Sequence, residues 1–263
     1  MLAAINDLSY SIGERTLFSH LQFIIEETDH LALIGVNGTG KSTLLKMIAT
    51  RQGDISFKKD TRIAYLPQAP ELDDNLTILQ QASKLSPHAK EFELKASLNR
   101  FGIENYDALV GPLSGGQKKR LALSCVMLND CDLLILDEPT NHLDTTMIEY
   151  LEKTLKKFNK AILMVTHDRY FLERITNRML ELDRGKLYSY EGNYESFLKQ
   201  KAEREATDLS AQHKREQFLK KELEWVRAGA QARSTKQKGR LQRFEKLSQI
   251  ESIKEVNNVE MIN

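Results

Sequence analysis

Short apolar runs that end in glycine or polar residues set the pattern of the first 190 residues. Residues 133–136 and 161–165 are wholly apolar, which is typical of parallel strands covered on both faces. A third run, residues 31–34, passes directly into a glycine-rich segment. This pattern predicts an α/β fold with a mostly parallel core sheet, and it places polar residues where the strands end.

Other stretches alternate or follow a helical period. Residues 1 to about 30 alternate apolar and polar positions around a turn at Gly13, which predicts a small antiparallel sheet. Residues 62–68 predict a further short strand that ends in a polar residue, and residues 179–190 predict a closing hairpin. Apolar positions at helical spacing predict helices over about 76–101, from 115 onward, and over about 145–158.

The composition of the chain changes after Asn193. Residues 194 to about 226 contain no proline or glycine and are rich in charge, and a second helical pattern runs over about 236–253. We therefore expect two antiparallel helices with a tip near residues 229–235. The predicted organisation lists a nucleotide-binding domain at 1–190, a helical linker hairpin at 191–255, and a flexible or truncated tail at 256–263.

Composition narrows the class of protein without naming a partner. The 263 residues carry 38 Lys and Arg against 37 Asp and Glu, so bulk charge points to no partner. Cys125 and Cys131 lack metal-ligand spacing, which favours a reducing, cytoplasmic setting. The first residues lack the features of a signal peptide, and no stretch approaches the length of a membrane span. Any membrane role is therefore expected to run through a partner.

The glycine-rich segment, residues 35–43, has the spacing of a phosphate-binding loop between a strand and a helix. Glycines let backbone N–H groups face a triphosphate, and the helix that follows points its positive end at the same anion. Lys41 would reach the β- and γ-phosphates, and the Ser42 hydroxyl would ligate Mg²⁺. The alternative is a glycine turn that happens to precede a lysine. The predicted nucleotide ligands in this loop are Gly35, Asn37, Gly38, Gly40, Lys41, Ser42 and Thr43.

Four polar residues at strand ends are candidates for the chemistry. Asp137 follows an apolar strand, where a carboxylate supports Mg²⁺ in phosphate-loop folds, and Glu138 is free to deprotonate a water. His167 follows the next strand, within reach of a γ-phosphate, and Gln68 would contact the metal or the water. The alternatives are helix-capping roles for the carboxylates and a structural role for the histidine.

A second glycine-bearing helix start is formed by Ser114, Gly115, Gly116 and Gln117, which we call the signature segment. Ser114 is a good N-cap, and bare N–H groups there would bind another anion. One chain cannot easily aim two helix starts at one phosphate from opposite sides. The signature segment is therefore expected to face a nucleotide held by a different domain.

Together these segments resemble the motif set of the ATP-binding-cassette ATPases, in the family's order and over roughly residues 1–190. The resemblance implies an ATPase cassette with a mostly parallel core sheet, an antiparallel β subdomain and a small helical subdomain, followed here by the α-helical hairpin. It implies ATP and Mg²⁺ as cofactors, Glu138 as catalytic base, His167 as switch histidine and Gln68 as the Q-loop residue. The family usually stacks an aromatic on adenine where this chain has Ile12, with Tyr10 two residues earlier.

Residues 139–144 and 190–197 resemble the ABC-F branch, whose members are soluble proteins with two cassettes joined by a helical linker, and residues 224–240 are similar to the linker of Uup-like bacterial members. The segment between Gln68 and Ser114 is too short for an inserted arm. The sequence holds one phosphate loop and one signature segment, so we expect the N-terminal half of a longer protein. A second cassette, in the same chain or in a homodimer, would complete the sites.

Basic residues cluster around the predicted linker tip, which is an electrostatic footprint for a phosphate backbone. A solvated pair of charged helices is the alternative. The predicted nucleic-acid contacts are Arg227, Arg233, Lys236, Lys238, Arg240 and Arg243.

Three function hypotheses follow. The leading one is an ATP-driven translation factor whose linker tip contacts tRNA or rRNA on the ribosome. A DNA-structure-binding ATPase is a variant of this hypothesis that uses the same basic tip. The second hypothesis is the ATPase subunit of a membrane transporter. The third is a nucleotide-gated binding module that does not hydrolyse ATP; the presence of both Glu138 and His167 argues against it.

Overall fold

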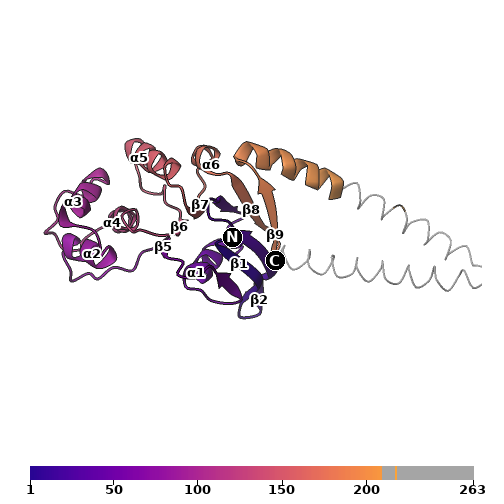
Figure 1. Ribbon diagram of the computed structural model, residues 1–263, viewed down its shortest axis with the longest axis horizontal. Coiled ribbons are helices and arrows are strands. Elements are labelled where there is room, and N and C mark those ends of the chain that lie inside the picture. Colours follow the sequence, from indigo (N-terminus) through magenta and orange to yellow (C-terminus); the bar gives the residue numbers. More distant parts are fainter. Residues whose placement is uncertain (209–216, 218–263) are drawn as a thin grey trace, which may run out of the picture. The chain divides into compact units, whose positions relative to one another are not determined.

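The computed structural model describes residues 1–208 and residue 217. The chain divides into two units, Met1–Lys199 and Gln200–Asn263. A helix over residues 194–208 is the last described element. The predicted second linker helix, the tip and the tail all lie outside the described residues, so the fold below is that of the first unit (Figure 1).

A mixed sheet forms the centre of this unit and confirms the predicted parallel core. In the described part of the chain its strand order is β5-β6-β7-β3-β8-β9, parallel except for β9, which closes an antiparallel hairpin with β8 as predicted. Both β6 and β7 are buried along their whole length, as expected for strands covered on two faces. The strands are β3 (His30–Ile34), β5 (Ile63–Leu66), β6 (Leu133–Asp137), β7 (Ala161–Val165), β8 (Arg178–Asp183) and β9 (Lys186–Glu191).

A smaller antiparallel sheet comes mainly from the alternating N-terminal segment. Strands β1 (Ala3–Ile12) and β2 (Arg15–Ile25) form the predicted hairpin. The short strand β4 (Ile55–Phe57) adds to the other edge of β1. The sequence pattern did not indicate β4, because three residues are too few to show an alternation.

Helices cover both faces of the core sheet. Helix α1 (Lys41–Ala49) packs its apolar face between the two sheets, in one hydrophobic cluster with residues of β1, β2, β6 and β7. Helices α5 (Thr145–Lys156) and α6 (Arg169–Ile175) lie on the opposite face (Figure 1). The sequence analysis missed α6. Its start is marked by Asp168, whose side chain accepts a hydrogen bond from the N–H of Phe171.

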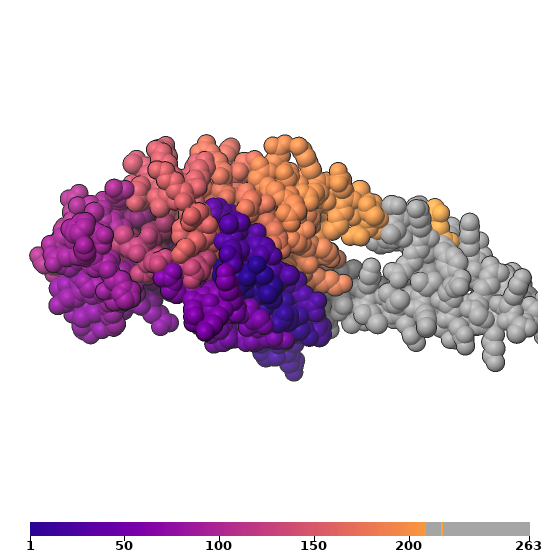
Figure 2. Space-filling view, viewed as in Figure 1, coloured from indigo at the N-terminus to yellow at the C-terminus, as the bar shows by residue number. Residues whose placement is uncertain are grey.

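Three helices form a lobe at one end of the first unit (Figure 2). They are α2 (Ile78–Leu85), α3 (Glu91–Arg100) and α4 (Gly115–Val126). They share a further hydrophobic cluster, and α4 also packs against the core sheet. The predicted single helical stretch over 76–101 is thus two helices. The break between them falls at Pro87, which directly follows Ser86, the C-cap residue of α2. A residue that precedes a proline disfavours the helical backbone conformation.

We expect Leu163→Ala to lower the free energy of unfolding of the protein by about 2–5 kcal/mol, because Leu163 lies in the middle of β7 with its side chain fully buried. Chemical denaturation followed by circular dichroism measures this change. Leu109→Ala is the matched control, since half of that leucine is exposed. An equal loss in the two variants would contradict the placement of β7 at the centre of the core.

Candidate functional site

The phosphate loop lies between the end of β3 and the start of α1, as its spacing predicts. Gly35 packs against β8 so closely that a Cβ atom there would come within 2.4 Å of the Leu182 carbonyl oxygen. Gly40 is the N-cap residue of α1 and has a φ of 97°, and no side chain at this position accepts a hydrogen bond from the first N–H groups of the helix. A side chain is thus excluded at Gly35 and strained at Gly40. The first N–H groups of α1 are left for an anion.

Lys41 is held inside this loop. Its ammonium group donates to the carbonyl oxygens of Gly35 (2.8 Å) and Val36 (3.0 Å), and the side chain is buried. Burial lowers the pKa of Lys41, while the charges of Glu138 and Asp137 favour its charged form. The Thr39 hydroxyl also donates to the Val36 carbonyl. These bonds fix the curve of the loop and keep a cation beside it.

Asp137 is the last residue of β6, and its carboxylate is buried near Ser42, Lys41 and Lys119. Neither of its oxygens has a hydrogen-bond partner within hydrogen-bonding geometry among the described residues. Burial raises the pKa of Asp137, and the Ser42 hydroxyl and the Lys119 and Lys41 ammonium groups oppose that shift. A buried carboxylate without partners, next to a serine hydroxyl, is a site suited to a divalent cation.

Glu138 follows directly, with a backbone φ of 51° that residues with side chains rarely adopt. Its N–H donates to the Val165 carbonyl at 2.8 Å, which ties it to the end of β7. One carboxylate oxygen, Oε1, lies 3.3 Å from Nε2 of His167, while Oε2 is buried without a partner in the described residues. Burial raises the pKa of Glu138, and the neighbouring His167 lowers it.

A hydroxyl pair connects the segments after β6 and β7. The side-chain oxygens of Thr140 and Thr166 are 2.8 Å apart and buried, and the Thr166 oxygen also accepts from the N–H of Asp168. The segments that carry Glu138 and His167 are therefore joined by two contacts, the bond from the Glu138 N–H to the end of β7 and the Thr140–Thr166 pair. The sequence patterns did not single out this pair.

A hollow of about 460 Å³ brings Gln68, Gly115 and Glu138 together from three distant parts of the chain. The signature segment starts α4 with the predicted cap: the Ser114 hydroxyl accepts from the Gln117 N–H, and the Gln117 side chain accepts from the Ser114 N–H. The residues that line the hollow do not include the phosphate loop. The structure thus places the signature segment beside Glu138 and apart from the loop.

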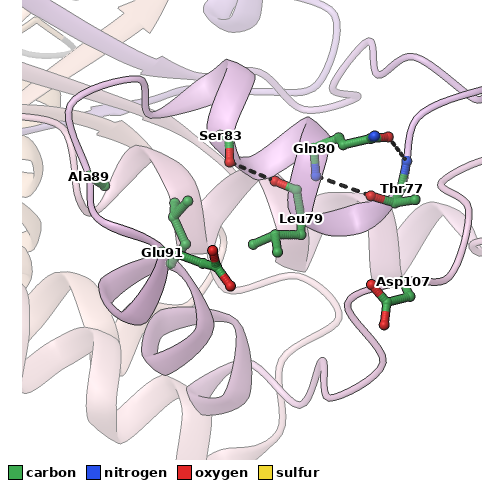
Figure 3. A pocket seen from close by; sticks show the side chains of 8 residues that line it. Thr77, Leu79, Gln80, Ser83, Ala89, Glu91 and Asp107 are labelled. Carbon is green, nitrogen blue, oxygen red and sulfur yellow. Dashed lines mark hydrogen bonds between the residues drawn. The ribbon is translucent and has the colours of Figure 1, made fainter.

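A larger hollow, of about 550 Å³, lies in the helical lobe between α2 and α3 (Figure 3). Its lining includes the carboxylates of Glu91 and Asp107 and no cationic side chain. Carboxylates repel phosphate oxygens. This hollow is therefore unsuited to a nucleotide phosphate, despite its size.

The turn between β1 and β2 carries Ile12 at the position where the resemblance noted above implies an aromatic residue that stacks on adenine. The Tyr10 ring stacks on Phe18, with the ring centroids 6.1 Å apart, and packs against the core. Ile12 is 59% exposed. An exposed isoleucine, rather than a tyrosine, is the apolar side chain offered at this turn.

One buried residue near these groups, Lys119, escaped the sequence analysis. Its ammonium group donates to the Asp137 carbonyl at 2.6 Å. The signal was present: Lys119 shares a helix face with Ala122, Leu123 and Val126, at i+3, i+4 and i+7, and all three are buried. The predicted nucleic-acid residues from Arg227 to Arg243, by contrast, lie outside the described residues.

Comparisons with known proteins agree with this fold. Two family models, both described as "ABC transporter", match residues 18–141 and 180–261. A solved structure described as the ATP binding subunit of an ABC transporter superposes with a TM-score of 0.66 at 26% identity, covering 77% of this chain and 94% of that one. Within the described residues, no helix has the length and apolar character needed to cross a lipid bilayer.

Three curated relatives cover most of the chain. The uncharacterized ABC transporter ATP-binding protein YfmR of Bacillus subtilis is 41% identical over 92% of this chain, and ATP-binding protein Uup of Buchnera aphidicola is 36% identical over 99%. The energy-dependent translational throttle protein EttA of Escherichia coli K12 is 35% identical over 84%. The chain spans about half the length of these relatives, 46%, 46% and 48% respectively. The chain therefore belongs to the ATP-binding-cassette family and, with its relatives Uup and EttA, to the ABC-F branch of that family.

Proposed function

We propose that the chain binds ATP with Mg²⁺ and hydrolyses it, and that a second cassette is needed for full activity. The observation that carries this proposal is the meeting of three features at one edge of the sheet: the phosphate loop, a buried carboxylate without partners, and the contact between Glu138 and His167. Each comes from a different strand end, β3, β6 or β7. Ligands of open α/β sheets bind at the carboxyl ends of the strands.

The phosphate end of ATP would lie on the first turn of α1, where bare N–H groups and Lys41 meet its charge. Ser42 and Asp137 would hold Mg²⁺, and the cation would neutralise charge on the β- and γ-phosphates. The described residues hold no group of three or more His, Cys, Asp or Glu side chains suited to a metal.

Glu138 would act as the general base. Its Oε2 is buried without a partner among the described residues and would accept a proton from a water that enters the site, while Oε1 faces His167 at 3.3 Å. The strained backbone and the bond to Val165 fix the direction of this carboxylate. His167 holds Glu138 on one side and, being largely exposed on the other, can contact the γ-phosphate. Gln68 reaches the same hollow and can orient the water.

We expect Glu138→Gln to lower the kcat for ATP hydrolysis by about a hundredfold or more, because the amide cannot accept the proton. ATP binding should persist, since the phosphate loop is unchanged. Phosphate release and binding of a fluorescent ATP analogue measure the two effects. The control is Glu149→Gln on the exposed face of α5. Unchanged hydrolysis in Glu138→Gln would show that another group is the base.

The raised pKa of Glu138 predicts a pH profile. The base works only when deprotonated, so kcat should fall on acidification, with a midpoint above the ordinary glutamate value of 4.5. Because His167 lowers the pKa of Glu138, His167→Ala should move this midpoint to higher pH while also lowering kcat. Rates measured between pH 5 and 9 test the direction. A midpoint that moves toward acid in His167→Ala would contradict the assignment.

We further propose that the whole protein acts on the ribosome as a translation factor, with the basic linker tip contacting tRNA or rRNA. The support is the set of relatives: one curated relative is named a translational throttle protein. A structure at 25% identity and a TM-score of 0.62 is described as an archaeal ribosome recycling factor in complex with a ribosomal stalk protein. The charge of the tip supports contact with a phosphate backbone.

A transporter ATPase is the second candidate. Its support is the description "ABC transporter" on both family matches and on a solved structure of similar fold. This candidate needs a membrane partner and offers no use for the basic tip. The two candidates therefore differ in where the protein sediments.

Co-sedimentation in ATP separates them. In the Glu138→Gln protein, which should stay ATP-bound, we expect pelleting with ribosomes. Changing Arg233, Lys236, Lys238 and Arg240 to Ala should abolish it, since each change removes a phosphate contact. The matched control changes four exposed lysines of the cassette, Lys46, Lys59, Lys153 and Lys157, to Ala.

Equal loss in the tip variant and in the control variant would assign the effect to bulk charge and contradict a contact at the tip. Recovery of the protein with the membrane fraction instead would favour the transporter. Binding to branched DNA with no ribosome pelleting would favour a DNA-directed ATPase.

A further inference from the structure

Lys119 is a buried cation in the second turn of α4. Only 2% of its surface is exposed. It follows the signature segment by two residues and lies on the helix face that packs against the core sheet, with Ala122, Leu123 and Val126. A lysine is costly to bury unless its charge and its hydrogen-bond donors are met.

All three donors of this ammonium group are met by main-chain carbonyls. Nζ lies 2.5 Å from the carbonyl oxygen of Pro67, 3.2 Å from that of Gln68 and 2.6 Å from that of Asp137. An ammonium group has three N–H donors. The bonds join α4 to two separate segments, the one that follows β5 and the one that ends β6.

The nearby carboxylates keep this group charged. Burial lowers the pKa of Lys119 to about 8, and the charges of Asp137 and Glu138 oppose that shift. The ammonium form, with three donors, is therefore the main one at pH 7. The neighbouring Lys118 differs, because its ammonium pairs with the Asp74 carboxylate at 2.6 Å, within the helical lobe.

The segments that Lys119 joins carry the groups of the proposed reaction. The Pro67 and Gln68 carbonyls belong to the segment that carries the Gln68 side chain, and the Asp137 carbonyl is in the peptide that continues into Glu138. Gln68, Gly115, Lys119 and Glu138 line one hollow. Among the described residues, Lys119 donates its hydrogen bonds to Pro67, Gln68 and Asp137 and not to the phosphate loop. The Lys41 ammonium in that loop has its own carbonyl partners.

We propose that Lys119 is a positioning residue that locks the start of α4 to the Gln68 segment and to the Asp137–Glu138 peptide, so that hydrolysis depends on where the signature segment lies. The inference rests on the proposed ATPase function. Displacement of α4 would pull on the two carbonyl segments through one ammonium group. The signature segment and the catalytic carboxylate are thereby coupled within a single cassette.

The key variant is Lys119→Met, which keeps the length of the side chain and removes all three donors. We expect kcat to fall by about 10- to 100-fold, because small misplacement of catalytic groups carries penalties of this size. The dissociation constant for ATP should stay within about threefold, because the phosphate loop is untouched. Lys119→Arg should recover most of the lost kcat, because the guanidinium group keeps the positive charge and several N–H donors for the three carbonyl oxygens.

Two further measurements separate positioning from simple loss of fold. Rates are expressed per ATP-binding site, titrated with a fluorescent ATP analogue, so that unfolded protein does not count. Hydrogen exchange without nucleotide should rise at residues 67–70 and 137–142 in Lys119→Met and stay unchanged in α1. Lys153→Met, on the exposed face of α5, is the matched control.

The outcomes are distinct. Normal kcat in folded Lys119→Met, or a lowered kcat that Lys119→Arg leaves equally low, would overturn the proposal. If Lys119→Met does not fold, Lys119→Gln, which keeps one donor, takes its place with the same readouts. Absence of ATP hydrolysis in the wild-type protein would sink the proposed function, whereas the hydrogen-exchange result would still test the lock itself.

Discussion

The structure depends on two carboxylates held at the end of a strand that has no exposed residue. Every position of β6 is buried, including Asp137, and Glu138 follows it at 6% exposure. Burying charge in this way is unfavourable unless cations and donors lie nearby. Lys41 approaches from the phosphate loop and Lys119 from α4. The packing of α1 and α4 on the sheet therefore also supplies the positive charges that stabilise the two buried carboxylates.

Strain marks the same place in the backbone. Glu138 and His142 both have positive φ, 51° and 65°, within five residues of each other. Such conformations cost about 1–3 kcal/mol each and persist only where the surroundings fix them. Here the Glu138 N–H bonds to β7, the Thr140 and Thr166 hydroxyls pair, and Asp144 caps α5 by accepting from the Met147 N–H. The segment between β6 and α5 is thus held at three points, and the direction of Glu138 is set by its backbone as well as by His167.

Much of this fold is visible in the sequence because the strongest signals are local. The runs at 133–136 and 161–165 predict buried parallel strands, and the spacing from Gly35 to Ser42 predicts a strand, loop and helix in that order. The elements that were missed or merged are short or broken: β4 has three residues, α6 has seven, and Pro87 divides α2 from α3. Periodicity needs more residues than these to register.

The chemistry of the site is less visible, because it depends on contacts between distant segments. Strand-end positions identify Asp137, Glu138 and His167 as candidates, since parallel strands bring their carboxyl ends to one edge. The hydrogen bonds of Lys119 have no such sequence signature. Its acceptors are main-chain carbonyls at Pro67, Gln68 and Asp137, and a carbonyl looks the same at every position of a sequence. Helical periodicity shows that Lys119 faces inward, but only the fold shows what it meets.

The two glycine-bearing helix starts lie apart in the first unit. The start of α1 carries the phosphate loop, while the start of α4 opens into the hollow shared by Gln68 and Glu138, which the loop does not line. Each start has bare N–H groups suited to an anion. Under the proposed function, a single cassette therefore offers one cradle for a nucleotide and a second glycine-bearing turn that lies apart from it. Two cassettes placed head to tail would bring both turns to each nucleotide, and a lysine that joins α4 to the Asp137–Glu138 peptide would let the proposed general base respond to what the second cassette does to the signature segment.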